Sequence, residues 1–167
     1  MERVTTSRWF AVLLGLVFIA FDQWIKVLAL LSLAAQSFKI GGSFAWLDIA
    51  LSLNPGAFLS LGAGLAPAVK QLIFIVGVGA VVCWAIGWAL SRWASSPGKA
   101  LAVYCIALGG ASNLIDRVLR DGHVVDYLVL NLGSLHTGVF NLADIAIMAG
   151  AAALLVAELR KPRQARG

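Results

Sequence analysis

Four long apolar blocks, separated by more polar stretches, dominate the pattern of the sequence. They run over about residues 9–31, 67–90, 100–119 and 139–159. A helix that crosses a bilayer needs about 20 predominantly apolar residues, and each block has roughly this length. The pattern therefore predicts four membrane-spanning helices that form a single polytopic domain over residues 1–167.

The stretch at 32–66, between the first two blocks, follows a different pattern. It contains Gly, Ser and short apolar-polar alternation, as in "SFKIGGSFAWLDIALSLNPGAF", with a turn signal at Pro55-Gly56. Such a pattern predicts short strands and turns. The connector at 120–138 mixes polar and apolar residues, and the basic tail at 160–167 is expected to be disordered. The expected fold class is an all-α membrane protein with four transmembrane helices and a small β-rich segment after the first.

The composition supports a membrane protein. The chain is 60% hydrophobic and 13% charged, with a mean hydropathy of +0.89, which is far from the balance of a soluble domain. The net charge of +5 comes mostly from residues that flank the apolar blocks, and no basic patch interleaved with aromatics suggests a nucleic-acid partner. Cys83 and Cys105 lie inside apolar blocks and are interpreted as small buried hydrophobes.

The basic residues predict how the helices are oriented. If both termini are cytoplasmic, that side carries Arg3, Arg8, Arg92, Lys99, Arg160, Lys161, Arg163 and Arg166. The opposite side then carries the smaller set, Lys26, Lys39, Lys70, Arg117 and Arg120. Because cytoplasmic loops are enriched in Lys and Arg, the chain is expected to have both termini inside.

Most polar residues of the apolar blocks gather at the outer ends of the expected helices or in the outer connectors. They are Asp22, Lys26, Asn54, Asn113, Asp116, Arg117, Asp126, Asn141 and Asp144. Ionisable groups at membrane depth usually face one another or a wet cavity. The sequence therefore predicts a polar pocket near the outer membrane surface.

Two carboxylates, Asp126 and Asp144, are the strongest chemical candidates in this pocket. Neighbouring carboxylates share a proton, so one can act as a base toward water and the other as an acid, without a metal or cofactor. Ser-His-Asp hydrolysis is disfavoured, because His123 and His136 fall in the connector and no nucleophile elbow surrounds Ser112. A zinc site is disfavoured because clustered His and Cys ligands are missing from the sequence.

Spacing alone leaves other interpretations open. A small transporter or channel could use the same carboxylates as a proton relay. Asp144 could be a carboxylate favoured at a helix N-terminus, and Asp126 could be a solvated loop residue. Asp22 and Lys26 could form an i,i+4 ion pair. Asp116 and Arg117 could form another, and Asn113 and Asn141 could cap or cross-link helices.

Five motifs, in order, resemble the lipoprotein signal peptidase (signal peptidase II) family of bacterial membrane aspartyl proteases. They are "FDQWIK", "LNPGAF", "GGASNLIDR", "VVDY" and "FNLAD". The resemblance implies that Asp126 and Asp144 are the catalytic dyad and that Asn113 and Arg117 contact the substrate backbone. It implies that Asp116 is structural. The remaining matching residues of the family's polar support are Asp22, Lys26, Asn54, Gly56, Asn141 and Ala143.

The same resemblance implies the reaction and its location. The substrate would be a diacylglyceryl-modified prolipoprotein, cut just before its lipidated Cys. The enzyme would be a monomer in the lipid of the bacterial inner (cytoplasmic) membrane, with its site near the periplasmic face and with no cofactor. Residues 32–66 would form an extracytoplasmic β-cradle, and a mobile part of 120–138 would cover the site. A non-catalytic lipopeptide-binding relative is a further alternative. The chain departs from the family pattern at Ile25, at 55–60 and at 133–138.

Overall fold

Helices form most of the computed structural model, which describes residues 7–56 and 64–160. The expected disordered tail beyond Arg160 and the departure at 57–60 lie outside the described residues. The elements are α1 (Arg8–Ser32), β1 (Phe38–Gly41), β2 (Ala45–Asn54), α2 (Pro67–Gln71), the π-helix η2 (Leu72–Gly77), α3 (Val78–Arg92), α4 (Pro97–Leu119), β3 (Val124–Leu132), β4 (Leu135–His136) and α5 (Leu142–Leu159).

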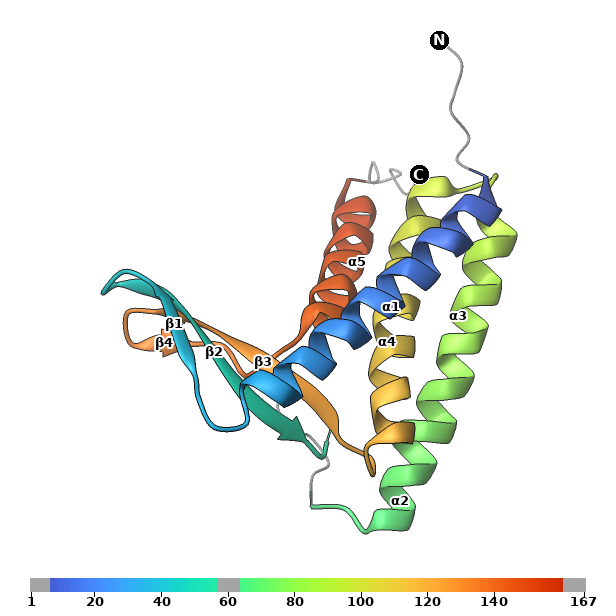
Figure 1. Ribbon diagram of the computed structural model, residues 1–167. Coiled ribbons are helices and arrows are strands. Elements are labelled where there is room, and N and C mark those ends of the chain that lie inside the picture. Colours follow the sequence, from blue (N-terminus) through green and yellow to red (C-terminus); the bar gives the residue numbers. More distant parts are fainter. Residues whose placement is uncertain (1–6, 57–63, 161–167) are drawn as a thin grey trace.

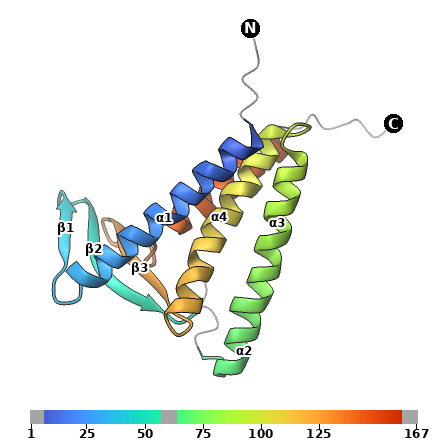
Figure 2. The same ribbon diagram turned by 45° about the vertical axis from the view of Figure 1, so that its right-hand side comes forward.

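Four helices of the described chain are long and apolar enough to cross a membrane: Arg8–Ser32, Leu72–Arg92, Pro97–Leu119 and Leu142–Leu159. This confirms the predicted fold class. α1 begins, and α5 ends, at the same end of the bundle, as Figure 1 shows. In both Figure 1 and Figure 2, α4 lies beside α3, and α1 crosses in front of α4. α4 also packs closely along α5.

Two helices begin at other residues than the predicted blocks, because residues typical of helix starts set where they begin. α4 begins at Pro97, not at 100, because proline is well tolerated in the first turn of a helix. α5 begins at Leu142, not at 139, because Asn141 caps it. The second block begins as predicted at Pro67, but the stretch Leu72–Gly77 is wound as a π-helix.

The sheet draws on more of the chain than predicted. Its four antiparallel strands follow the order β1-β2-β3-β4, and only β1 and β2 come from the 32–66 stretch. The other two strands come from the 120–138 connector, in which the sequence predicted no strands. Mixed polarity hides this strand in the sequence, because β3 is specified by its pairing with β2.

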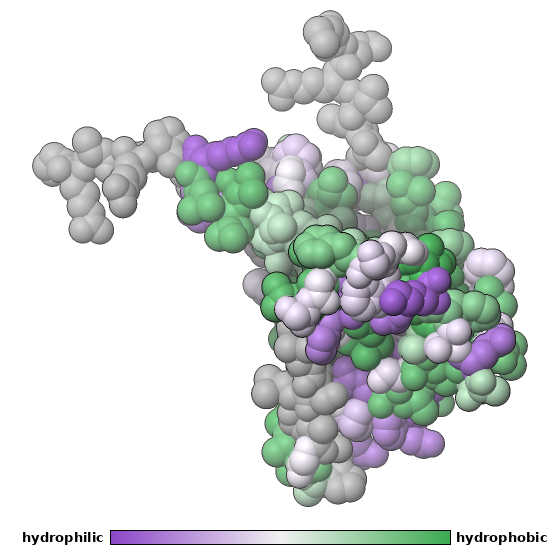
Figure 3. Space-filling model, turned by 90° about the vertical axis from the view of Figure 1, so that its left-hand side faces the viewer, coloured by the Kyte–Doolittle hydropathy of each residue, from purple (hydrophilic) through white to green (hydrophobic). Residues whose placement is uncertain are grey.

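The outer part of the sheet has two unlike faces. One face is apolar. On it, three pairs of residues lie directly opposite one another: Phe38 and Ile49, Ile40 and Leu47, and Leu47 and Leu130. The other face carries Lys39, Trp46, Asp48 and Asn131, linked by the Lys39 ammonium over the Trp46 ring and by two hydrogen bonds to Asp48. Seen from the sheet side, apolar and polar residues are accordingly mixed on the surface (Figure 3). The alternation matches a half-buried strand pattern.

Small residues bring α4 and α5 close together. A Cβ on Gly150 would lie 2.5 Å from the Ala102 carbonyl oxygen and 2.8 Å from Ile106 Cγ1. A Cβ on Gly109 would meet the Ala143 carbonyl oxygen in the same way. Such close approach of backbones is how helices associate without a hydrophobic driving force between them.

A buried charge cluster joins α1 to α4. The Lys26 ammonium, which is 0% exposed, lies 2.9 Å from Asp22 Oδ2 and 3.0 Å from Asp116 Oδ2. The predicted pair of Asp22 and Lys26 is therefore present. Asp116, however, pairs with Lys26 and Arg120 and not with Arg117, because Arg117 lies on another face of α4 and donates to backbone carbonyls.

We expect Gly150→Ala to destabilise the protein by about 1–3 kcal/mol, because the added methyl group would be forced into the Ala102 backbone. The matched control is Gly87→Ala on α3, where a Cβ meets nothing within 4 Å. Thermal unfolding in detergent, followed by tryptophan fluorescence, measures both. Equal unfolding temperatures for the two variants would contradict the close packing of α4 on α5.

We expect Lys26→Met to destabilise the fold by about 3–5 kcal/mol, because it leaves the buried Asp22 carboxylate without a cation and removes one of the two cations that pair with Asp116. Lys39→Met is the control, since Lys39 is exposed and its main contact is the Trp46 ring. The same unfolding assay applies. A loss for Lys26→Met no larger than for the control would show that the cluster adds no net stability.

Candidate active site

Asp126 lies on the first half of β3, where alternate residues have opposite surroundings. Val125 and Tyr127 are buried in an apolar cluster with Ala29 and Leu33 at the end of α1. Because side chains alternate along a strand, Asp126 points to the opposite side. It is only 2% exposed, so the alternative of a solvated loop residue was wrong.

An irregularity in β2 brings Asn54 to the same side as Asp126. The register between β2 and β3 shifts between Ile49 and Ser52, so that one extra residue stands on β2. A one-residue shift turns the following side chains to the other face of a sheet. As a result Ser52 pairs with Asp126, Asn54 follows on the same face, and Asn54 Nδ2 donates to Asp126 Oδ2 at 3.0 Å.

The start of α5 is tied to β3 by the backbone. Phe140 forms an isolated bridge with Leu128, and its amide and carbonyl exchange hydrogen bonds of 2.9 Å with Leu128. This bridge sets Asn141 beside Asp126. Asn141 has an extended backbone and is the N-cap of α5, so the alternative of a capping role is correct for this residue.

Asp144 lies in the first turn of α5 as part of a capping box. Its backbone N–H donates to Asn141 Oδ1 at 2.9 Å, and its Oδ2 accepts from the Asn141 backbone N–H at 3.2 Å. A cap of this kind contributes about 1 kcal/mol. The alternative of a helix N-terminal carboxylate is therefore correct as a description of Asp144. This capping role does not exclude a chemical role for Asp144, because the capping box uses only Oδ2 and the other oxygen, Oδ1, is directed at Asn113.

Asn141 connects the two carboxylates directly. Its Nδ2 donates to Asp126 Oδ1 at 2.7 Å while its backbone N–H donates to Asp144 Oδ2. Asn113 Nδ2 donates to Asp144 Oδ1 at 2.8 Å, and Asn54 donates to the remaining oxygen of Asp126. Each of the four carboxylate oxygens thus accepts a hydrogen bond from a neutral amide.

The orientation of the Asn113 amide is fixed by Lys26. Lysine can only donate, so the Lys26 ammonium, 2.8 Å away, must face Asn113 Oδ1. Asn141 Nδ2 donates to the same oxygen at 3.1 Å. The amide nitrogen of Asn113 is therefore directed at Asp144, and the charge cluster below the site orders the amides above it.

The electrostatics of Asp126 favour its neutral form. Burial raises the pKa of Asp126 to about 6, and the negative charge of Asp144 adds to the rise. Hydrogen bonds from Asn54 and Asn141 and the charge of Lys26 oppose this shift. Among the described residues no Lys or Arg forms an ion pair with either Asp126 or Asp144.

A cavity opens beside the two carboxylates, and we call it the dyad cavity. Its polar lining residues are Asn54, Asn113, Arg117, Asp126 and Asp144, and its other lining residues are Val78, Gly110, Val124, Val139, Ile147 and Met148. It combines an apolar wall with a few convergent polar groups, as substrate sites do. The described part of the chain contains no group of His, Cys, Asp and Glu that could hold a metal ion.

The other predicted residues surround the cavity without lining it. Asp22 Oδ1 accepts from the Ala143 backbone N–H at 3.0 Å and so holds the first turn of α5. Gly56 follows β2, and its carbonyl accepts from Arg117 Nη2 at 2.5 Å. Asp22, Lys26 and Asp116 are buried below the dyad cavity.

Three residues of the buried network were missed as site residues. Gln23 Nε2 donates to both Ser112 and Asp116, and the Ser112 hydroxyl donates to Asp22 Oδ2 at 2.6 Å. Arg120 donates to Gln23 Oε1 at 3.2 Å. A signal existed, because Gln23 is a polar residue inside an apolar block and directly follows Asp22.

Comparison with known proteins gives the family of this chain. The family described as signal peptidase (SPase) II matches residues 14–160. The lipoprotein signal peptidase of Ralstonia nicotianae is 36% identical over 152 residues, which cover 90% of this chain and 84% of the relative. That of Cupriavidus taiwanensis is 36% identical over 162 residues, covering 96% of this chain and 87% of the relative.

Two solved structures, both described as bacterial membrane enzymes studied by the in meso method, share the fold. Their TM-scores are 0.70 and 0.69, at 22% and 24% identity, and they match 93% and 90% of this chain and 93% of each of those chains. These comparisons do not favour the transporter or channel alternative. The chain belongs to the signal peptidase II family, a family of aspartic proteases.

Proposed function

We propose that this protein removes the signal peptide from diacylglyceryl-modified prolipoproteins by cutting before the lipidated Cys, with Asp126 and Asp144 as its catalytic dyad. Membership of the signal peptidase II family supports the substrate class. One observation carries the choice of residues. The buried carboxylate of Asp126 and the half-buried carboxylate of Asp144 border one cavity and are joined by Asn141, and among the described residues their oxygens accept from neutral amide donors only.

The neutral donors matter for the chemistry. An Arg or Lys bound to either carboxylate would hold it ionised and make it a poor acid. Amide donors instead fix the positions of Asp126 and Asp144 and leave their charge free to change during the reaction. The pair can then hold one proton, with one carboxyl as the acid and the other carboxylate as the base.

In the first step, the ionised carboxylate removes a proton from a water molecule as its oxygen attacks the scissile carbonyl carbon. The protonated carboxyl gives its proton to the carbonyl oxygen, and a neutral tetrahedral diol forms. The single proton of the dyad has thus changed places between the two carboxyls.

In the second step, the diol collapses. The newly protonated carboxyl gives its proton to the leaving nitrogen as the C–N bond breaks, and the other carboxylate takes a hydroxyl proton from the diol. The products are the carboxyl end of the signal peptide and the free amine of the lipidated Cys. The dyad regains its starting protonation, and no cofactor is consumed.

The proposed location is the bacterial inner membrane, with both termini cytoplasmic and the dyad near the periplasmic face. The start of α1 and the end of α5 lie together at one end of the bundle, whereas β3, which carries Asp126, and the start of α5, which carries Asp144, lie away from that end (Figure 1). Basic residues flank the former end. This depth suits a substrate whose lipidated Cys is held at the membrane surface. A monomer has all the proposed catalytic residues in one chain.

We expect Asp126→Asn and Asp144→Asn each to lower kcat by at least about 10³-fold, because an amide can neither accept nor donate the transferred proton. Cleavage of a diacylglyceryl prolipoprotein by purified protein in detergent measures this. Asp48→Asn, on the far part of β2, is the matched control and should keep normal turnover. Near-normal turnover by either dyad variant, with an unfolding temperature like that of the wild type, would remove that residue from the mechanism.

We expect kcat/KM to fall about tenfold per pH unit above about pH 6. As pH rises through the pKa of Asp126, about 6, the pair loses its single proton and no acid remains for the carbonyl oxygen. Folding raises the pKa of Asp126 from its ordinary value of 3.8 to about 6, so the folded protein holds this proton more tightly than the unfolded chain does. The free energy of unfolding therefore falls as pH rises from about 3.8 to about 6. A flat profile of kcat/KM from pH 5 to 8.5 would be inconsistent with this assignment.

A further inference from the structure

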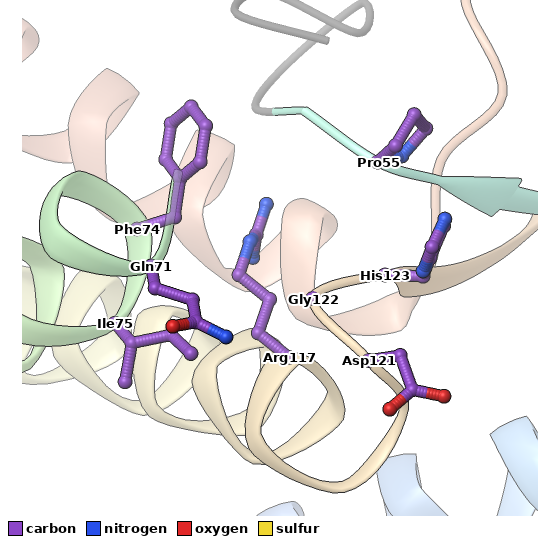
Figure 4. A pocket seen from close by; sticks show the side chains of 8 residues that line it. All are labelled: Pro55, Gln71, Phe74, Ile75, Arg117, Asp121, Gly122 and His123. Carbon is purple, nitrogen blue, oxygen red and sulfur yellow. The ribbon is translucent and has the colours of Figure 1, made fainter. Parts of the chain in front are cut away.

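A second cavity lies next to the dyad cavity, and we call it the outer cavity. Its lining residues are Pro55, Gln71, Phe74, Ile75, Arg117, Asp121, Gly122 and His123. Figure 4 shows Phe74 and Gln71 on one side of the Arg117 side chain and Pro55, Gly122 and His123 on the other. None of these residues is used in the reaction proposed above.

The two cavities are neighbours. Arg117 lines both of them. Pro55 directly follows Asn54, and His123 directly precedes Val124, so each outer residue continues a segment that lines the dyad cavity. A chain bound across the dyad that continues into the outer cavity would follow a path past Arg117.

The ends of this path have opposite character. The dyad cavity extends along Gly110, Ile147 and Met148, within the membrane-spanning parts of α4 and α5. The outer cavity is bordered instead by the turn that follows α4, which holds Asp121 and His123. An apolar segment suits the first end, and a polar segment outside the membrane suits the second.

Arg117 presents an unused donor between the cavities. Its guanidinium group is fixed, since Nη2 donates to the Gly56 carbonyl at 2.5 Å, Nη1 to the Asn113 carbonyl at 3.3 Å, and the Phe74 ring lies 5.4 Å from its central carbon. The side chain is only 9% exposed, yet its Nε has no hydrogen-bond partner among the described residues. A buried donor without an acceptor is costly and rare.

We propose that the outer cavity binds the first residues of the mature lipoprotein, with a peptide carbonyl oxygen of the substrate accepting from Arg117 Nε. The inference rests on the proposed function, because that function fixes the direction of the substrate. The signal peptide lies toward the apolar end of the path, so the chain beyond the lipidated Cys leaves past Arg117.

The lining of the outer cavity also sets a side-chain preference. Asp121 is exposed at its rim, and Gln71 and His123 offer polar atoms from either side. The Nη1 and Nη2 atoms of Arg117 already donate to the Asn113 and Gly56 carbonyls, and Nε remains for the substrate backbone. An acidic side chain next to Asp121 at the rim would be repelled by its carboxylate, whereas a neutral polar side chain would not be and a basic one would be attracted. The rim of the cavity beside Asp121 therefore disfavours Asp and Glu near the start of the mature chain.

The first test shortens the substrate. Two lipidated peptides share the signal region and the diacylglyceryl Cys, but one ends as an amide at the Cys and the other continues for four residues. We expect KM to be at least about tenfold higher for the shorter peptide, with kcat changed much less, because binding outside the reacting bond is lost. Equal KM values for the two peptides would overturn the proposal.

The second test places charge in the cavity. Asp and Asn are compared at each of the first three residues after the Cys, with wild-type protein, Asp121→Asn and the control Asp48→Asn. At one of these positions Asp should raise KM about threefold or more over Asn, and Asp121→Asn, but not Asp48→Asn, should abolish the difference. A difference that persists in Asp121→Asn would overturn the assignment of the cavity.

Binding separates this proposal from the proposed function. The same peptides are titrated against Asp144→Asn by fluorescence anisotropy, which requires no turnover. If the wild type cuts nothing but the longer peptide still binds more tightly, the proposed function fails and the cavity assignment stands. If cleavage is normal and affinity is insensitive to peptide length but sensitive to anionic lipid, the cavity holds a lipid phosphate and the proposal is wrong.

Discussion

The Lys26 ammonium is the interaction on which the rest of the site depends. It is fully buried, and three oxygens surround it, from Asp22 on its own helix and from Asn113 and Asp116 on α4. Through Asp22 it is coupled to the first turn of α5, and through Asp116 to the backbone N–H of Val125 on β3. A cation buried in an apolar helix bundle requires such partners, and meeting that requirement aligns the segments that carry the dyad.

The residues that form ion pairs lie in one layer of the site, and the reactive carboxylates are held in another. The cluster around Lys26 contains the ion pairs, and the layer above it contains Asn54, Asn113 and Asn141, which are polar but uncharged. The lower layer therefore provides rigidity. The amides of the upper layer hold Asp126 in position through hydrogen bonds and do not fix its charge. An arginine does border the dyad cavity, but Arg117 is bound to backbone carbonyls.

Much of this arrangement could be predicted from sequence, and the remainder depends on contacts distant along the chain. Helix length and hydropathy were sufficient for the four apolar helices. Resemblance to a family was sufficient to nominate Asp126 and Asp144. The strand character of β3 could not be predicted, because it comes from pairing with β2, which is more than 70 residues away, as the 72-residue separation of Asn54 and Asp126 shows. The capping role of Asn141 was accessible, since an Asn three residues before an Asp is a known helix-start signal.

The extra residue in β2 separates two functions that a regular strand would tie together. In a regular strand, odd and even positions are committed to opposite faces from end to end. Here the phase changes between Ile49 and Ser52, so the outer half of β2 can present Leu47 and Ile49 with the apolar face while the inner half presents Asn54 to Asp126. A single deletion between Ile49 and Ser52 would turn Asn54 away from the carboxylate it supports.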